Sequence, residues 1–158
     1  MKFSLKKIFT LIVFNLYQVL WYFFLPIALL YFVYRSIKEP GYASNLIERL
    51  SFYKKDLKGA CWCHAVSLGE FRAARPIFDK LLLNGEKLLI TTLTLSGKCA
   101  AQRQYHKEIN ENKMVIVYAP LEIGFMLKRF LKNFKPKCCI ILECDLWPVM
   151  ITTTCKEK

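Results

Sequence analysis

The sequence predicts an α/β protein with a parallel sheet, preceded by an N-terminal membrane-anchor helix. From Ala60 onward, short apolar segments alternate with amphipathic ones, which is typical of strands that alternate with helices. The strand-like segments are almost continuously apolar, as in parallel sheets that helices cover on both faces. The anchor is indicated by the run from Ile8 to Tyr34, which contains no charged residue and exceeds the roughly 20 residues that a membrane span needs. These observations divide the 158-residue chain into an anchor (1–34), a linker with a short helix (35–59) and an α/β domain (60–158).

The apolar run is too long for a secretory signal peptide, and no small-residue cleavage site follows it. It can span a bilayer with tilt or with a bend at Pro26, and a re-entrant or monotopic hairpin around Pro26 is the alternative. Three lysines precede the run, whereas six basic residues follow it before residue 59. This asymmetry favours a domain on the cytoplasmic side.

The elements of the linker and the domain follow from turn signals and apolar spacing. Residues 38–41 (KEPG) are a breaker, and a short amphipathic helix is expected over 45–50. The helix after the first strand places Phe71, Ala74 and Phe78 at three- and four-residue spacings, and Asn84-Gly85 ends it. Strands are expected at 60–64, 88–92, 114–118 and 137–142. Helices are expected at 70–83, 98–107, 123–134 and from 146 onward.

The charge of the chain indicates an anionic partner. The net charge is +12, and 21 of the 24 basic residues lie after the apolar run with all 12 acidic ones, giving the rest of the chain a charge near +9. A basic domain tethered to a bilayer is attracted to anionic headgroups. Nucleic acid is the usual alternative, but no zinc-finger spacing, RNA-binding aromatic motif or recognition-helix pattern supports it. A basic surface that serves solubility alone remains a third interpretation.

The seven cysteines do not have the spacing of a zinc site, which usually combines two closely spaced pairs. They are interpreted as small buried hydrophobic residues in a reducing compartment, so we expect neither a metal ion nor a disulfide. His64 has no second ligand nearby in the sequence and is expected to be a packed strand residue.

Polar residues, glycines and a proline gather after the predicted strands. Because parallel strands end at one edge of the sheet, and open α/β sheets bind ligands there, these residues are candidates for a common site. They are Ser67, Gly69 and Glu70 after the first strand, Thr92, Thr94 and Gly97 after the second, Pro120 and Glu122 after the third, and Glu143 after the fourth.

The first of these groups has two interpretations. Ser67 with Glu70 three residues later is a capping box for the following helix. Glu70 can equally be a general base at the mouth of a cleft, where burial raises the pKa of a carboxyl group towards the working pH. Gly69 would let the backbone turn tightly or approach a ligand closely.

The other groups are also ambiguous. The hydroxyl-rich segment 91–97 can bind sugar hydroxyls or phosphate, or can simply cap a helix. Glu143 follows an apolar strand, where burying an unpaired charge is costly, so it either pairs with Arg72 or Arg75 or has a function. The absence of a Walker motif, a GxGxxG motif and a nucleophile elbow argues against a P-loop NTPase, a dinucleotide enzyme and an α/β hydrolase.

Five blocks together resemble one known family. The anchor is followed by residues 38–42 (KEPGY), 48–53 (ERLSFY), 64–70 (HAVSLGE), 91–97 (TTLTLSG) and 143–148 (ECDLWP). In this order the blocks resemble the N-terminal half of a 3-deoxy-D-manno-octulosonic acid (Kdo) transferase of lipopolysaccharide synthesis, and they cover nearly the whole chain.

The resemblance implies a GT-B glycosyltransferase, in which two Rossmann-like domains face each other across a cleft and residues 60–158 form the acceptor domain. It implies transfer of Kdo from CMP-Kdo to the lipid A precursor (lipid IVA) at the cytoplasmic face of the bacterial inner membrane, without a cofactor or a metal. Glu70 would be the catalytic base and Glu143 a transition-state stabiliser. Substrate contacts are expected from Ser67, Gly69, Thr92, Thr94 and Gly97.

The chain departs from the family pattern in two ways. Cys144-Asp145 stand where the family usually has Thr-Glu, and Val149 stands where it usually has Asn. The chain also ends at Lys158, before the donor domain that binds most of the nucleotide sugar, so we expect a truncated chain that is inactive alone. The alternative function is a non-enzymatic, membrane-tethered α/β module that binds anionic lipid or a partner protein.

Overall fold

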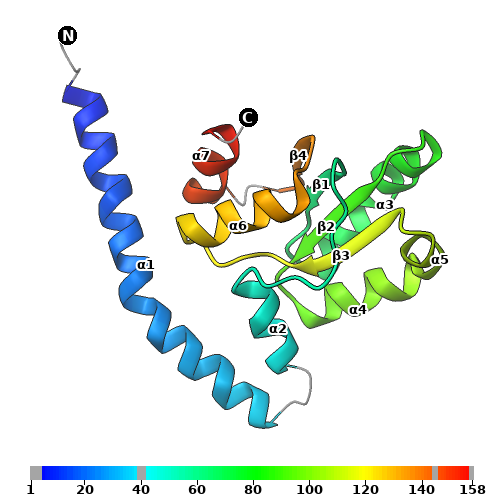
Figure 1. Ribbon diagram of the computed structural model, residues 1–158, viewed down its shortest axis with the longest axis horizontal. Helices are drawn as coiled ribbons and strands as arrows, with labels where there is room; N and C mark the ends of the chain where they lie inside the picture. The colour runs from blue at the N-terminus through cyan, green and yellow to red at the C-terminus, as the bar shows by residue number, and fades with distance from the viewer. Residues whose placement is uncertain (1–4, 39–41, 144–145, 157–158) are drawn as a thin grey trace.

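The computed structural model describes residues 5–38, 42–143 and 146–156. It contains helices that flank a parallel sheet (Figure 1), which confirms the predicted α/β class. The strands are β1 (Cys61–His64), β2 (Leu88–Thr92), β3 (Met114–Tyr118) and β4 (Cys138–Ile141). The helices are α1 (Leu5–Lys38), α2 (Tyr42–Arg49), α3 (Leu68–Leu83), α4 (Leu95–Gln104), α5 (His106–Asn110), α6 (Gly124–Phe134) and α7 (Pro148–Lys156).

The strands pair in the order β3-β2-β1-β4. In the register, Cys61 of β1 lies opposite Leu88 of β2 on one side and Cys138 of β4 on the other. The chain therefore builds outward from β1 through β2 to β3, and then crosses back to place β4 on the opposite side of β1. This reversal leaves a topological switch point between the carboxyl ends of β1 and β4.

Both faces of the sheet bury apolar side chains. On one face Cys63 and Ile90 pack with Phe71 and Phe78 of α3 and with residues of α4. On the other face α6 and α7 cover Trp62 and its neighbours, and the Trp62 and Phe130 rings lie 4.7 Å apart between centroids. Burial on two faces explains why the strands are apolar at successive positions and not only at alternate ones.

The helix expected at 98–107 begins earlier and is divided in two. The Thr94 side chain accepts a hydrogen bond from the N–H of Gly97, so α4 starts at Leu95. Tyr105 separates α4 from α5, and its buried ring places the hydroxyl 2.6 Å from Asp79 Oδ1, to which it donates. Anchoring of this side chain to α3 is a tertiary effect that helical spacing does not reveal.

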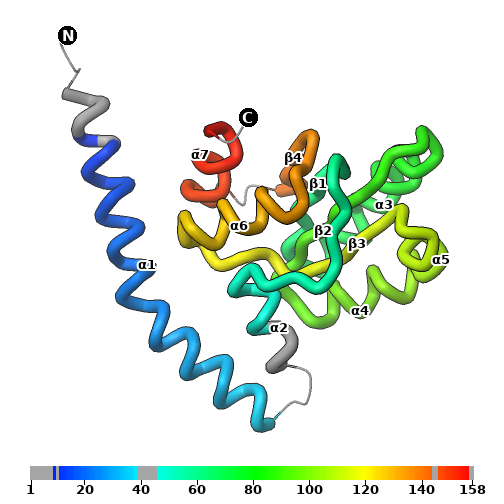
Figure 2. The backbone as a smooth tube through the Cα atoms, in the orientation of Figure 1, coloured from blue at the N-terminus to red at the C-terminus, as the bar shows by residue number. Residues whose placement is uncertain are grey.

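The N-terminal helix is continuous through Pro26, so the alternative of a hairpin at this proline was wrong. α1 is long and apolar enough to cross a membrane. It runs alongside the domain on the side of α6 and α7 (Figure 2), where Phe14 and Tyr17 pack against the core. Residues 39–41 of the predicted breaker lie outside the described residues.

Candidate active site

The two carboxylates predicted to be catalytic follow neighbouring strands. Glu70 lies in the first turn of α3, directly after β1, and Glu143 lies in a bend after β4. Because β1 and β4 are adjacent and parallel, both residues belong to the edge of the sheet at the switch point. This is where open α/β sheets bind their ligands.

Glu70 forms the predicted capping box. Its N–H donates to Ser67 Oγ at 3.2 Å, while its carboxylate accepts the N–H of Val66 at 2.7 Å and that of Ser67 at 3.2 Å. The residue is only 7% exposed. The capping interpretation is therefore confirmed, and the role of Glu70 as a base stays a prediction. A carboxylate has about four lone-pair sites, so the two N–H groups leave lone pairs that can accept from a substrate hydroxyl.

Thr92 and Thr94, which were predicted to contact substrate, form hydrogen bonds that hold the chain at the end of β2. Thr92 is buried and its hydroxyl donates to the Val66 carbonyl at 3.0 Å, joining the loop after β2 to the loop after β1. The Thr94 hydroxyl caps α4 by accepting the N–H of Gly97 at 3.1 Å. The side chains of this segment thus have structural partners, and their contact with substrate remains a prediction.

The two glycines of the site differ in what the fold requires. A Cβ atom at Gly97 would lie 2.8 Å from both Thr92 Oγ1 and Thr94 Oγ1, which is a severe overlap. A Cβ at Gly69 would lie 3.7 Å from Ser67 Oγ, which is an ordinary contact, and Gly69 is exposed without a left-handed φ. The fold therefore needs glycine at position 97, whereas the free space at position 69 is available to a ligand.

We expect opposite stability effects from alanine at these positions. Gly97→Ala should lower the free energy of unfolding by about 1–3 kcal/mol because it overpacks the two hydroxyls. Gly69→Ala should leave it unchanged or raise it by up to about 1 kcal/mol through the helix propensity of alanine. Urea unfolding followed by circular dichroism in mild detergent measures both. Equal destabilisation would contradict the difference in local space.

Glu143 is exposed, so the expectation of a costly buried charge after β4 was wrong. The strand stops at Ile141, and the chain bends outward at Glu143. Among the described residues no ion pair joins Glu143 to Arg72 or Arg75. The side chain is therefore available to solvent or substrate. Cys144 and Asp145, which depart from the family pattern, lie outside the described residues.

Glu122, a candidate for the common site after the third strand, is a buried carboxylate that is 2% exposed. Its Oε1 accepts the N–H groups of Val149 at 2.7 Å and Met150 at 3.1 Å, both in the first turn of α7. Within the described ranges Oε2 has no hydrogen-bond partner, and the residue borders a cavity of 20 Å³, room for about one water molecule. Burial raises the pKa of Glu122 above its ordinary value. Glu122 thus fixes the start of α7, the helix that follows the Glu143 bend.

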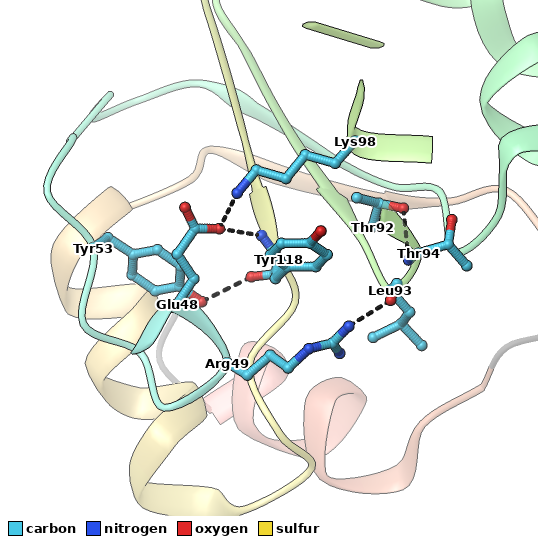
Figure 3. A network of polar contacts seen from close by, with 8 residues as sticks. All are labelled: Glu48, Arg49, Tyr53, Thr92, Leu93, Thr94, Lys98 and Tyr118. Carbon is cyan, nitrogen blue, oxygen red and sulfur yellow. Dashed lines mark hydrogen bonds and ion pairs between the residues drawn. The ribbon is translucent and has the colours of Figure 1, made fainter. Parts of the chain in front are cut away.

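Three residues to which the sequence analysis gave no role connect α2 to the carboxyl ends of the strands (Figure 3). They are Glu48, Arg49 and Lys98. Glu48 Oε2 accepts from Lys98 Nζ at 2.6 Å and from the N–H of Tyr118 at 2.8 Å, at the end of the edge strand β3. Arg49 is 8% exposed and donates to the Leu93 carbonyl at 2.5 Å. Its guanidinium also lies 4.7 Å from the Tyr118 ring centroid. These contacts hold the segment before the domain against the loop that contains Thr92 and Thr94.

His64 and the strand cysteines have packing roles, as expected. The ring of His64 is buried, with Nδ1 2.8 Å from Thr91 Oγ1, which also accepts from Trp62 Nε1. Burial raises the pKa of the Cys61 thiol to about 11 and that of Cys63 to about 12. Protonated thiols are poor nucleophiles and poor metal ligands, which agrees with packing roles for these two cysteines.

Comparison with known proteins identifies the family. A family model for 3-deoxy-D-manno-octulosonic-acid transferase (kdotransferase) matches residues 44–158, well over half of the chain. The 3-deoxy-D-manno-octulosonic acid transferase of Bordetella pertussis is 33% identical over 95 residues, which cover 60% of this chain and 22% of that protein. The Haemophilus influenzae enzyme of the same name is 31% identical over 134 residues, covering 80% of this chain and 30% of that enzyme.

A more distant relative extends the match. The "probable 3-deoxy-D-manno-octulosonic acid transferase, mitochondrial" of Arabidopsis thaliana is 30% identical over 147 residues, covering 88% of this chain and 31% of that protein. The chain thus spans about a third or less of the length of these relatives. The family match and the relatives together show that the chain belongs to the 3-deoxy-D-manno-octulosonic-acid transferase family.

Proposed function

We propose that this chain is the acceptor-side part of a transferase that moves Kdo from CMP-Kdo to lipid IVA, the lipid A precursor. The observation that carries the proposal is the position of Glu70 and Glu143 at the ends of adjacent strands, on either side of the switch point. Membership of a transferase family supports an enzymatic role over the alternative of a lipid-binding module without activity.

In the proposed reaction Glu70 accepts the proton of an acceptor hydroxyl. The hydroxyl oxygen then forms a bond to the anomeric carbon of Kdo, and the bond from that carbon to the CMP phosphate oxygen breaks, so CMP leaves with the electron pair. The capping N–H groups hold the carboxylate in one orientation, and a base positioned in this way contributes about 10²- to 10⁴-fold. This direct displacement inverts the anomeric carbon and needs no metal.

Glu143 is proposed to stabilise the positive charge that develops on the sugar ring in the transition state. Its exposure suits a group that meets a sugar presented from outside this domain. The nucleotide of the donor would be bound mainly by a second Rossmann-like domain, as the resemblance implies. Ser67, Gly69, Thr92, Thr94 and Gly97 would contribute the backbone and hydroxyl surface of the acceptor site.

A reconstitution experiment tests this division of labour. The 158-residue chain is assayed with CMP-Kdo and lipid IVA, alone and as a chimera followed by the C-terminal part of the Haemophilus influenzae relative. We expect Kdo on the lipid with the chimera and none with the chain alone. Robust turnover by the chain alone would refute the acceptor-side assignment. A folded chimera that cannot transfer, beside an active Haemophilus influenzae enzyme, would refute the proposed substrates.

The proposed location is the bacterial inner membrane, with the domain on its cytoplasmic side. The apolar helix α1 supports membrane association, and the net charge of +12 supports a surface of anionic lipid. A phosphorylated lipid acceptor would meet the site at this interface.

A further inference from the structure

Helix α1 has two different faces. Half-buried residues recur every three or four positions from Phe14 to Ser36 and form one continuous stripe. The opposite face consists of large exposed apolar side chains, including Val19 (62% exposed), Phe23 (70%) and Leu30 (71%). An exposed apolar surface of this length is unusual for a soluble monomer and indicates a contact with lipid or protein.

The half-buried stripe contacts α2 and the domain along most of the helix. Near its start, Phe14 and Tyr17 pack against the core of the α6 and α7 side. In the middle, the Trp21 ring lies 6.4 Å from the Trp147 ring. Towards its end, the Phe32 ring lies 5.1 Å from the Arg49 guanidinium. The contacts from Phe14 to Phe32 extend over about 27 Å of helix at 1.5 Å per residue.

A helix that keeps contacts over this length cannot also cross the bilayer without drawing charged groups into it. The hydrocarbon core is about 30 Å thick, so a spanning α1 that kept its contacts would draw α2 and the adjoining side of the domain into it. These parts include the buried Arg49 of α2 and the lysines 128 and 156. Charged groups in the hydrocarbon are costly. A helix lying parallel to the membrane avoids this cost, because only its outer face enters the lipid.

Charge complementarity supports the parallel arrangement. Phe14, Gln18 and Tyr22 of α1, with Lys128 of α6 and Lys156 of α7, line a groove of 340 Å³ between α1 and the domain. Both lysines are exposed. α1 has no charged residue from Ile8 to Tyr34, so the basic groups beside its apolar face come from the domain, and such lysines are attracted to anionic headgroups.

We propose that α1 lies lengthwise in one leaflet of an anionic bilayer, with Val19, Phe23 and Leu30 among the acyl chains and the domain against the headgroups. The occupant of the apolar face is the lipid, and the groove with Lys128 and Lys156 faces the headgroup phosphates. This arrangement rests on the proposed membrane association and adds to it that both ends of α1 are on the same side of the bilayer.

Two neighbouring substitutions distinguish the parallel helix from a spanning one. The chain is synthesised by cell-free translation with sealed vesicles of phosphatidylcholine and phosphatidylglycerol, and binding is measured by flotation. Val19→Glu places a charge on the lipid face and should weaken binding by at least about tenfold. Gln18→Glu places the same charge in the groove that Lys128 and Lys156 also line, outside the acyl chains, and should weaken binding by no more than about fivefold, the effect of one charge at an anionic surface. A spanning helix would suffer similarly from both, so equal losses would overturn the proposal.

A second measurement uses the unsubstituted sequence and does not depend on the folding of any variant. An epitope tag at the N-terminus is exposed to protease added outside the same sealed vesicles. If α1 lies in the outer leaflet, the tag is digested together with the domain. Protection of the tag while the domain is digested would overturn the proposal. Failure of the chain to float at all would instead refute membrane association, and transferase activity affects neither readout.

Discussion

Replacing Glu70 by glutamine is expected to reduce Kdo transfer by at least about 10²-fold while leaving the start of α3 intact. Glutamine is the other residue that closes a capping box at this position, because its one side-chain oxygen can still accept from Val66 or from Ser67, whose N–H groups bind the two separate oxygens of Glu70. It cannot, however, accept a proton from the acceptor hydroxyl at neutral pH. Glu70→Gln therefore separates the confirmed capping role from the proposed role as a base.

Glu70→Ala is the matched control, because it removes both roles. We expect it to lose transfer to the same extent and, in addition, to lower the free energy of unfolding by about 1 kcal/mol through the lost capping interactions. Transfer is measured in the chimera with the Haemophilus influenzae C-terminal part, and stability by urea unfolding of the 158-residue chain. Near-normal transfer by Glu70→Gln would reduce Glu70 to a capping residue.

Local sequence patterns predicted the strands and the capping box well. Each strand is a short apolar run that ends at a polar turn, which is typical of strands in a sheet that helices cover on both faces. The Ser67 and Glu70 pair is a local interaction over three residues, so its spacing alone predicted the hydrogen bonds that the structure shows. These parts of the site depend on neighbours in the chain.

Interactions between distant residues were not predictable in the same way. Glu122 is 27 residues from the N–H of Val149 that it binds, and Glu48 is 50 residues from Lys98. No spacing rule links such positions, because their distance depends on strand order and on how α2 and α7 pack against β3 and α6. The exposure of Glu143 also depends on how the chain leaves β4, which an apolar run cannot indicate.

The same limit applies to α1. Composition showed a run long enough to span a bilayer, but nearly every position of the run is apolar, so its periodicity could not show which face packs on protein. The stripe that begins at Phe14 and Tyr17 became visible only with the domain beside it. The proposed parallel orientation is therefore a tertiary inference from a helix whose sequence alone favours a span.

Replacing Glu122 is expected to have the largest effect on stability among the polar residues of the domain. Glu122→Ala would leave the N–H groups of Val149 and Met150 buried without their acceptor. Each unsatisfied buried group costs about 1–3 kcal/mol, so we expect a loss of about 2–4 kcal/mol in the free energy of unfolding. Hydrogen exchange at Val149 and Met150 should accelerate more than at β2 in the centre of the sheet. Uniform acceleration would mean that Glu122 does not act specifically on α7.

Glu122→Gln provides the pH-dependent test, because it retains an acceptor oxygen but cannot ionise. Burial raises the pKa of Glu122 above the ordinary value of 4.5, although the N–H groups of Met150 and Val149 oppose the shift. Between the ordinary and the raised pKa, the folded protein keeps a proton that the unfolded chain has lost. The stability of the wild type therefore falls as the pH rises through this window, whereas the glutamine variant lacks this fall.

Urea unfolding from about pH 4 to about pH 7 should show the stability of the wild type declining relative to the variant. A relative rise would mean that the hydrogen bonds from α7 outweigh the cost of burying the charge, which would reverse the assigned direction of the shift.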